Sequence, residues 1–198
     1  VTVERIVARE YHVEERTTLE VRAEEDGRTV FQSWALNEVT VEKASRERML
    51  ELTVEIDGRP LSTWGCDGVV MATPTGSTAY AFSAGGPVVW PDVEALLLVP
   101  ISAHALFARP VVVGPQSRFV VEVLAQTDAH GVVWCDGRRA VGLPPGARIH
   151  VRRSDEPVRL ARLSSGGFTD RLVEKFDLPV EGWRGAARRQ LARGDAPP

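Results

Sequence analysis

The sequence has little cysteine, no excess of positive charge and no long hydrophobic run. Two cysteines, Cys66 and Cys135, are too few for a disulfide scaffold or a cysteine-built zinc site, and they are typical of reduced thiols in a cytoplasmic protein. The 24 Lys and Arg residues face 27 Asp and Glu residues, which excludes a broad electrostatic contact with nucleic acid as the main activity. The longest apolar run, around residues 95–101, is far shorter than the roughly 18 residues that a membrane helix needs. We therefore expect a cytoplasmic protein with no nucleic-acid or membrane partner.

The chain also lacks an initial methionine. It begins with Val1, its only methionines are Met49 and Met71, and no charged segment followed by an apolar one stands at its start. A secretory signal peptide is therefore not expected. The simplest interpretation is a fragment whose N-terminal part lies outside the numbered sequence. Its 198 residues suffice for one domain, or two small ones, with a buried core.

Strand patterns dominate the residues that are present. Thr17–Ala23 and Leu50–Ile56 alternate polar and apolar residues, which predicts strands of an antiparallel sheet with one face in water. The same kind of pattern continues in four further segments: 30–43, 118–124, 132–135 and 148–152. Three short apolar runs predict strands covered on both faces: Gly68–Ala72, Leu96–Val99 and Val111–Val113. We predict a mainly β fold of packed or crossing antiparallel sheets with one or two short helices.

Turn and helix signals complete this prediction. Asp-Gly-Arg occurs between predicted strands at 26–28, 57–59 and 136–138, and each copy predicts a hairpin because Asp and Gly tolerate the positive φ angles of a type I′ turn. Thr78–Ala84 is predicted as one short helix. Phe168–Phe176 is predicted as another, with Thr169 as its N-cap. Residues 186–198 are predicted to form a flexible basic tail.

The segment Gly65–Gly86 has the composition of a ligand-binding turn. It combines a buried strand, a hydroxyl-rich turn and a short helix whose N-terminus offers unpaired backbone N–H groups. The hydroxyl groups of Thr75, Ser77 and Thr78 suit the phosphates, ribose or base edge of a nucleotide, and Tyr80 adds a flat surface for packing. An ordinary tight turn is the alternative, since neither the Walker A pattern nor G-x-G-x-x-G is present.

The segment Asp67–Pro87 closely resembles the glycine- and threonine-rich signature of NAD kinases. Four other segments are similar to landmarks of that family: Ala35–Val39 with its Asn-Glu pair, Pro100–Pro110, Cys135–Gly137 and Phe168–Leu172. The resemblance covers about Glu10 to Gly185, nearly the whole chain. It implies that residues 1–185 are the C-terminal, NAD-binding, β-sandwich-like domain of a bacterial, actinobacterial-like NAD kinase.

The resemblance also implies an activity. An NAD kinase phosphorylates the adenosine-ribose 2′-hydroxyl of NAD with ATP or polyphosphate to give NADP, with Mg²⁺ bound mainly through the nucleotide. The resemblance further implies a homodimer or homotetramer. The family's Gly-Gly-Asp-Gly motif, which binds ATP phosphates and supplies the catalytic aspartate, is absent from these residues. We therefore expect no catalytic residue or metal ligand within this chain, and no kinase activity from the 198 residues alone.

A set of NAD-binding residues follows from the same resemblance. Asn37 and Glu38 are expected near the adenosine ribose or adenine, and Asp67 near the nicotinamide end, often from a neighbouring subunit. The other expected contacts to the dinucleotide are Thr75, Thr78, Ala79, Tyr80 and Ser83. Arg48 and Arg138 are weaker candidates, for which a solvated arginine is the competing interpretation. Gly65 stands where relatives can carry a basic residue.

Two other functions stay open. A lipid kinase of the same superfamily, acting on diacylglycerol or a sphingoid lipid, would expose an apolar acceptor pocket, whereas the segment Thr78–Tyr80 is polar. A non-catalytic β-sandwich binding module would have no affinity for nucleotides. His104 is interpreted as a hydrogen-bonded structural histidine, because the four histidines show no metal-ligand spacing.

Overall fold

The computed structural model describes residues 2–46, 48–126, 129–163 and 166–180. The chain divides into a larger unit, Val13–Ala161, and a smaller unit formed by Val1–His12 and Arg162–Pro198. The smaller unit holds α1 (Thr2–Val7) and α3 (Phe168–Phe176). The tail predicted over 186–198 lies outside the described residues. No helix in the described ranges combines the length and hydrophobicity needed to cross a bilayer.

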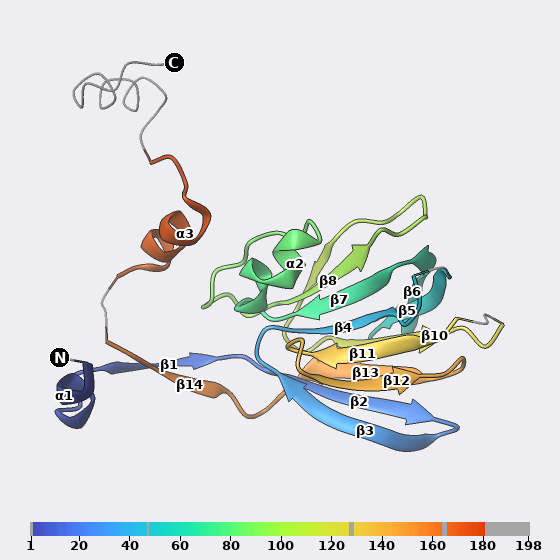
Figure 1. Cartoon of the computed structure of the whole chain (residues 1–198), viewed down its shortest axis with the longest axis horizontal. Helices are drawn as coiled ribbons and strands as arrows, with labels where there is room; N and C mark the ends of the chain where they lie inside the picture. Colours follow the sequence, from blue (N-terminus) through green and yellow to red (C-terminus); the bar gives the residue numbers. More distant parts are fainter. Residues whose placement is uncertain (1, 47, 127–128, 164–165, 181–198) are drawn as a thin grey trace, which may run out of the picture. The chain divides into compact units, whose positions relative to one another are not determined.

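Two six-stranded antiparallel sheets form most of the larger unit (Figure 1). The strands of sheet 1 are β2 (Leu19–Glu25), β3 (Arg28–Ala35), β5 (Leu50–Ile56), β6 (Arg59–Cys66), β10 (Arg118–Val123) and β13 (Arg148–Arg153). The strands of sheet 2 are β4 (Glu38–Lys43), β7 (Gly68–Ala72), β8 (Leu96–Ile101), β9 (Val111–Val113), β11 (Gly131–Cys135) and β12 (Arg139–Leu143). Sheet 1 has the order β3-β2-β13-β10-β5-β6 and sheet 2 the order β12-β11-β4-β7-β8-β9. A third, two-stranded sheet pairs β1 (His12–Arg16) with β14 (Val158–Arg162). The predicted mainly β, antiparallel fold is confirmed.

One apolar core lies between sheets 1 and 2. Alternate residues of each strand point into it, as the period-two patterns predict, and its largest members include Trp64 and Phe119 from sheet 1 and Met71 and Leu96 from sheet 2. Each such side chain contributes about 1.5–3 kcal/mol when it leaves water. This core fixes the two sheets and therefore the strand ends on which the site is built.

A second apolar cluster covers the outer face of β7 and β8. Outward residues of these strands, such as Val70 and Leu97, pack with Ala81 and Val89 from the segment that contains α2 (Tyr80–Ser83). Figure 1 shows this helix in green beside β7 and β8. The prediction that 68–72 and 96–99 are covered on both faces is therefore confirmed. The same prediction for 111–113 is wrong: β9 is the edge strand of sheet 2, and Val112 is 51% exposed.

The turns were predicted more accurately than the strand boundaries. All three Asp-Gly-Arg segments close hairpins, between β2 and β3, β5 and β6, and β11 and β12, and every Asp and Gly in them has a positive φ. The segment predicted as one strand over 30–43 is two strands in different sheets, because the chain turns at Leu36-Asn37 between β3 and β4. Strands β1, β6, β12 and β14 were not predicted.

Both predicted helices are present, and only the first has altered ends. In place of one helix over 78–84, the structure has a 3-10 turn, η1 (Gly76–Thr78), followed by α2. Helix α3 has the predicted bounds, but Thr169 is not its N-cap. Gly167 is the N-cap residue, and its backbone N–H donates to Oδ2 of Asp170 at 3.0 Å. A carboxylate one turn into the helix thus takes the place of the expected hydroxyl.

Candidate functional site

Thr73 fastens the hydroxyl-rich turn to the link between β3 and β4. Its side chain is fully buried, and its hydroxyl donates to the carbonyl oxygen of Leu36 at 2.7 Å. The hydroxyl oxygen of Thr73 also accepts from the backbone N–H of Gly76 at 3.1 Å. The backbone N–H of Thr73 donates to the carbonyl oxygen of Asn37 at 2.9 Å. These bonds hold the turn against residues 36–37.

Gly76 allows this turn to approach the link closely. A Cβ atom at Gly76 would lie 2.0 Å from the carbonyl oxygen of Asn37, so no other residue fits without moving backbone. Ser77 is also fully buried; its hydroxyl donates to the carbonyl oxygen of Pro74 at 2.7 Å and accepts from the N–H of Val89 at 2.9 Å. The expectation that Ser77 offers its hydroxyl to a ligand is therefore wrong, because the fold itself uses that group.

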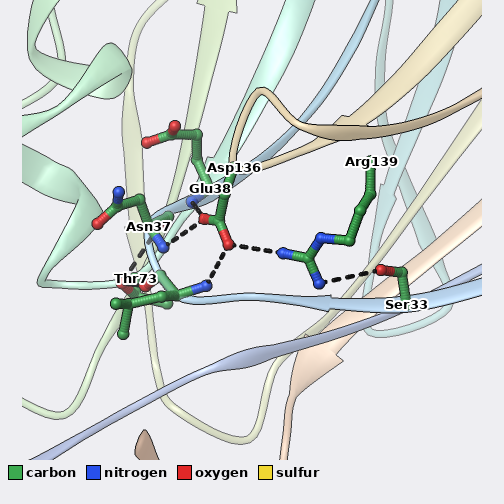
Figure 2. A network of polar contacts seen from close by, with 7 residues as sticks. Ser33, Asn37, Glu38, Thr73, Asp136 and Arg139 are labelled. Atoms are coloured by element: carbon green, nitrogen blue, oxygen red, sulfur yellow. Dashed lines mark hydrogen bonds and ion pairs between the residues drawn. The ribbon is translucent and has the colours of Figure 1, made fainter.

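Asp136, in the third Asp-Gly-Arg turn, reaches the same link from the other side. Its Oδ1 accepts from the backbone N–H groups of Asn37 at 2.8 Å and Glu38 at 3.3 Å, and its Oδ2 accepts from that of Leu36 at 3.0 Å. Nη2 of Arg139 donates to Oδ2 at 2.9 Å (Figure 2). Three segments that lie far apart in the sequence therefore meet at Asn37-Glu38.

A row of polar side chains continues from this point along β4. Glu38, Thr40 and Glu42 alternate with core residues and so share the outer face of sheet 2. Glu38 is 9% exposed and Thr40 only 3%, and the Thr40 hydroxyl donates to Oε1 of Glu42 at 2.5 Å. Thr40 and Glu42 were not predicted as site residues, although polar residues alternating with apolar ones along a buried strand are a signal that the sequence contains.

Tyr80 lies close to the polar row of β4. Burial raises the pKa of its hydroxyl above the ordinary value, and the negative charges of Glu42, Asp67 and Glu38 raise it further. The residue is nevertheless 38% exposed. Its ring is therefore available for packing against a ligand, beside carboxylates that can accept hydrogen bonds from hydroxyl groups.

Asp67 and Lys43 mark the other end of β4. Nζ of Lys43 lies 2.5 Å from Oδ1 of Asp67, and this hydrogen bond is the main cause that lowers the pKa of the Asp67 carboxyl below its usual range. Ser102 and the charge of His104 lower that pKa further. At about 3.3 Å per residue, Glu38 and Lys43 are about 16 Å apart along the strand. The candidate site thus has two polar ends with Tyr80 near the carboxylates of both.

The remaining predicted residues occupy four places. Thr75 precedes Gly76 in the turn, and Thr78, Ala79 and Ser83 lie with Tyr80 in the segment that leads into and forms α2. Arg48 lines a cavity of about 290 Å³ together with Lys43 and His130. Arg138 is exposed in the turn after Asp136, where the neighbouring Arg139, which was not predicted, makes the bond to the carboxylate. His104 contacts Gly65 through its backbone, with its N–H donating to the carbonyl oxygen at 2.8 Å.

Two kinds of chemistry find no support in the described residues. No group of three or more His, Cys, Asp or Glu side chains in them is placed to hold a metal ion. Both cysteines are free and buried, and burial raises the pKa of the Cys66 thiol to about 12 and also raises that of Cys135. A thiol with so high a pKa is not a thiolate nucleophile near neutral pH.

Comparisons with known proteins agree with this architecture. The chain matches the family described as ATP-NAD kinase C-terminal domain over residues 36–163. The NAD kinase of Leifsonia xyli subsp. xyli is 66% identical over 183 residues, which are 92% of this chain and 60% of that protein. The chain therefore spans less than two thirds of the length of this curated relative.

Two solved structures of NAD or NADH kinases are also similar to this chain. The yeast NADH kinase complexed with NADH has a TM-score of 0.81 and 25% identity, and the match covers 91% of this chain and 53% of that one. An NAD kinase from Archaeoglobus fulgidus in complex with ATP has a TM-score of 0.66 and 29% identity, over 82% of this chain and 60% of that one. In both cases the match covers only part of the other protein.

Proposed function

Because this chain belongs to the ATP-NAD kinase family, as its C-terminal domain, we propose that it is the NAD-binding part of an NAD kinase. The enzyme would join the 2′-oxygen of the adenosine ribose to the terminal phosphorus of ATP. The bond from that phosphorus to ADP breaks, the hydroxyl proton leaves, and the products are NADP and ADP. The observation that carries the proposal is the convergence of three family landmarks at Asn37-Glu38: the pair itself, the 73–77 turn and the Asp136-Gly137 hairpin.

The chain's own residues bind and orient the acceptor in this proposal. The amide of Asn37 can donate and accept, and the carboxylate of Glu38 can accept from ribose hydroxyl groups. Tyr80 supplies a packing surface between the two ends of β4, and Asp67 takes the nicotinamide end. Thr75, Thr78, Ala79 and Ser83 complete the dinucleotide site, with Arg48 and Arg138 as outlying candidates. Positioning of this kind is a large part of catalysis in phosphoryl transfer.

The donor side lies outside these assignments. ATP or polyphosphate would bind to the part of the enzyme that carries the Gly-Gly-Asp-Gly motif, and Mg²⁺ would accompany the donor's phosphates. Since the described residues offer no metal-binding cluster, we assign no ligand of that ion to this chain. We also propose that the protein is cytoplasmic and self-associates, and sedimentation at tens of micromolar would show at least a dimer.

A chimaera tests the proposed function. This chain would replace the matching 183 residues of the Leifsonia xyli relative, which supplies the remaining part of the enzyme. We expect the chimaera to form NADP from NAD and ATP, and we expect the 198-residue chain alone to form none. An Asn37→Ala chimaera serves as the control for the site. A folded chimaera that neither binds NAD nor forms NADP would overturn the proposal.

A further inference from the structure

The three Asp-Gly-Arg turns share one backbone conformation but not one role. Asp26, Asp57 and Asp136 have φ angles of 49°, 54° and 51°, and each is followed by a glycine with positive φ. The carboxylate of Asp57 accepts from the backbone N–H of Arg118 at 2.8 Å and from the Ser117 hydroxyl at 3.1 Å, within sheet 1. Only the carboxylate of Asp136 is bonded to the segment that holds the candidate ligand-binding pair.

The bonds to Asp136 fix both the position and the direction of that segment. Three consecutive backbone N–H groups, from Leu36 to Glu38, donate to one carboxylate, and the N–H of Asp136 donates back to the carbonyl oxygen of Glu38 at 3.0 Å. Figure 2 shows the backbone of Asn37 and Glu38 facing Asp136, with both side chains directed away from Arg139. Charge-assisted hydrogen bonds of this kind are the stronger ones in proteins.

Arg139 holds the carboxylate in turn. Besides its bond to Asp136, it donates through Nη1 to the Ser33 hydroxyl at 3.3 Å, and its guanidinium lies 4.7 Å from the centre of the Trp34 ring. Ser33 and Trp34 belong to β3 of sheet 1. The network therefore joins the turn of sheet 2 to an edge strand of sheet 1 across the end of the core.

We propose that Asp136 is a positioning residue for the acceptor: its carboxylate holds residues 36–38 so that the side chains of Asn37 and Glu38 meet the adenosine half of the dinucleotide. This inference rests on the proposed function and adds to it the group that sets the geometry of the binding pair. Asp136 itself does not touch the acceptor. Its effect is specific to one end of the ligand, because the Asp67 end is held separately by Lys43.

The test is NAD binding by the full chain, titrated to millimolar concentrations by calorimetry. Loss of several bonds to one carboxylate is expected to weaken NAD binding by about tenfold or more in Asp136→Ala. Asp57→Ala and Asp26→Ala are the matched controls, since they place alanine at the same positive φ in the same tripeptide, and both should bind NAD within about twofold of the unsubstituted chain. Asp136→Asn keeps Oδ1 and tolerates this backbone conformation, so it should fall between the two.

Two further readouts separate positioning from general damage. AMP and nicotinamide mononucleotide are the two halves of NAD, and Asp136→Ala should weaken AMP binding while leaving the nicotinamide half unchanged. Hydrogen exchange of the amides of residues 36–38 should rise in Asp136→Ala and not in Asp57→Ala. Should Asp136→Ala fail to fold, Asp136→Asn and Arg139→Lys carry the same measurements.

The outcomes are distinct. NAD affinity of Asp136→Ala equal to that of Asp57→Ala would overturn the positioning role alone, as would equal losses for both halves of NAD. If the unsubstituted chain binds no NAD, the same variants are titrated in the chimaera. A folded chimaera that neither binds NAD nor forms NADP would overturn the proposed function and remove the ligand on which the inference rests.

Discussion

The outer faces of the two sheets follow the same strand alternation and use polar residues in opposite ways. On sheet 1, Arg152 pairs with Glu20 at 2.5 Å and His150 with Glu24 at 3.1 Å, and these cross-strand pairs are partly exposed. On sheet 2, the polar row of β4 is largely buried, with Thr40 only 3% exposed. The outer face of sheet 1 is therefore a solvated surface. The polar row of β4 on sheet 2 is shielded from solvent, although its residues do not belong to the apolar core.

The difference is a matter of free energy. Exposed ion pairs contribute about 0–1 kcal/mol each, so their pattern can vary without effect on folding. A polar group that is buried without a partner costs about 1–3 kcal/mol, so a buried polar row is kept only where its groups are bonded or meet a ligand. The buried polar row of β4 is thus a physical reason, independent of any relative, for placing the candidate site on sheet 2.

The largest effect is expected from a substitution at Gly76, where the 73–77 turn packs against the link between β3 and β4. Gly76→Ala should lower the free energy of unfolding by about 1–3 kcal/mol, because the new Cβ overlaps the backbone of Asn37. NAD binding should be lost with it. Denaturant unfolding and NAD titration measure both effects. Gly114→Ala is the control, since a Cβ at Gly114 meets no atom within 4 Å and should change neither quantity. Wild-type stability in Gly76→Ala would contradict the close contact.

Removing one ligand-facing side chain should have the next largest effect. Asn37→Ala and Tyr80→Ala should each weaken NAD binding by about 1–3 kcal/mol, roughly five- to hundredfold, without a comparable loss of stability. Arg28→Ala, in the exposed hairpin between β2 and β3, should be nearly neutral. The chimaera or the full chain gives the affinities. If both site variants bind NAD as Arg28→Ala does, the site lies elsewhere.

A titration can show the acidic character of the sheet 2 face. Tyr80 has a raised pKa when folded, so its contribution to stability is fully present below the unfolded pKa of about 10 and is lost as pH rises through the folded pKa. Glu42→Gln should lower the pKa of Tyr80 toward the ordinary value. Tyrosine absorbance measures this in a Tyr11→Phe background, since the chain has two tyrosines. Glu24→Gln on sheet 1 should leave the pKa unchanged; an equal shift would show that the two faces do not differ.

The smallest effect is expected on the solvated face. A double-mutant cycle of Glu20→Ala and Arg152→Ala should give a coupling free energy below about 1 kcal/mol, and added salt should reduce it. NAD affinity should not change in any of these variants. A coupling of several kcal/mol would show that the outer face of sheet 1 is as specific a structure as that of sheet 2.

Local signals predicted the elements that depend on local chemistry. The strands at 50–56 and 68–72 have the predicted bounds, and the three Asp-Gly-Arg hairpins form because their backbone angles suit those residues. The strand β6 was missed because Pro60 interrupts its pattern, and an edge strand of a sheet tolerates proline. The break between β3 and β4 was missed because the alternation runs through it.

The missed features of the site depend on partners far away in the sequence. The turn at Leu36-Asn37 is stabilised by Asp136, which lies 99 residues from Asn37, so no window around the turn contains its cause. Arg139 was passed over in favour of its neighbour Arg138, since only the folded structure distinguishes the two. The family membership suggested by the Asp67–Pro87 signature is confirmed, whereas the individual NAD contacts stay predictions.

The long-range bond between Asp136 and Asn37 also orders events during synthesis. At about 5–20 residues per second, a ribosome adds the 99 residues that separate the two positions in about 5–20 s. During that interval the link between β3 and β4 has no carboxylate to hold it, although its Asn-Glu pair is already made. The link therefore gains this anchor only after the hairpin of β11 and β12 leaves the ribosome and pairs with β4.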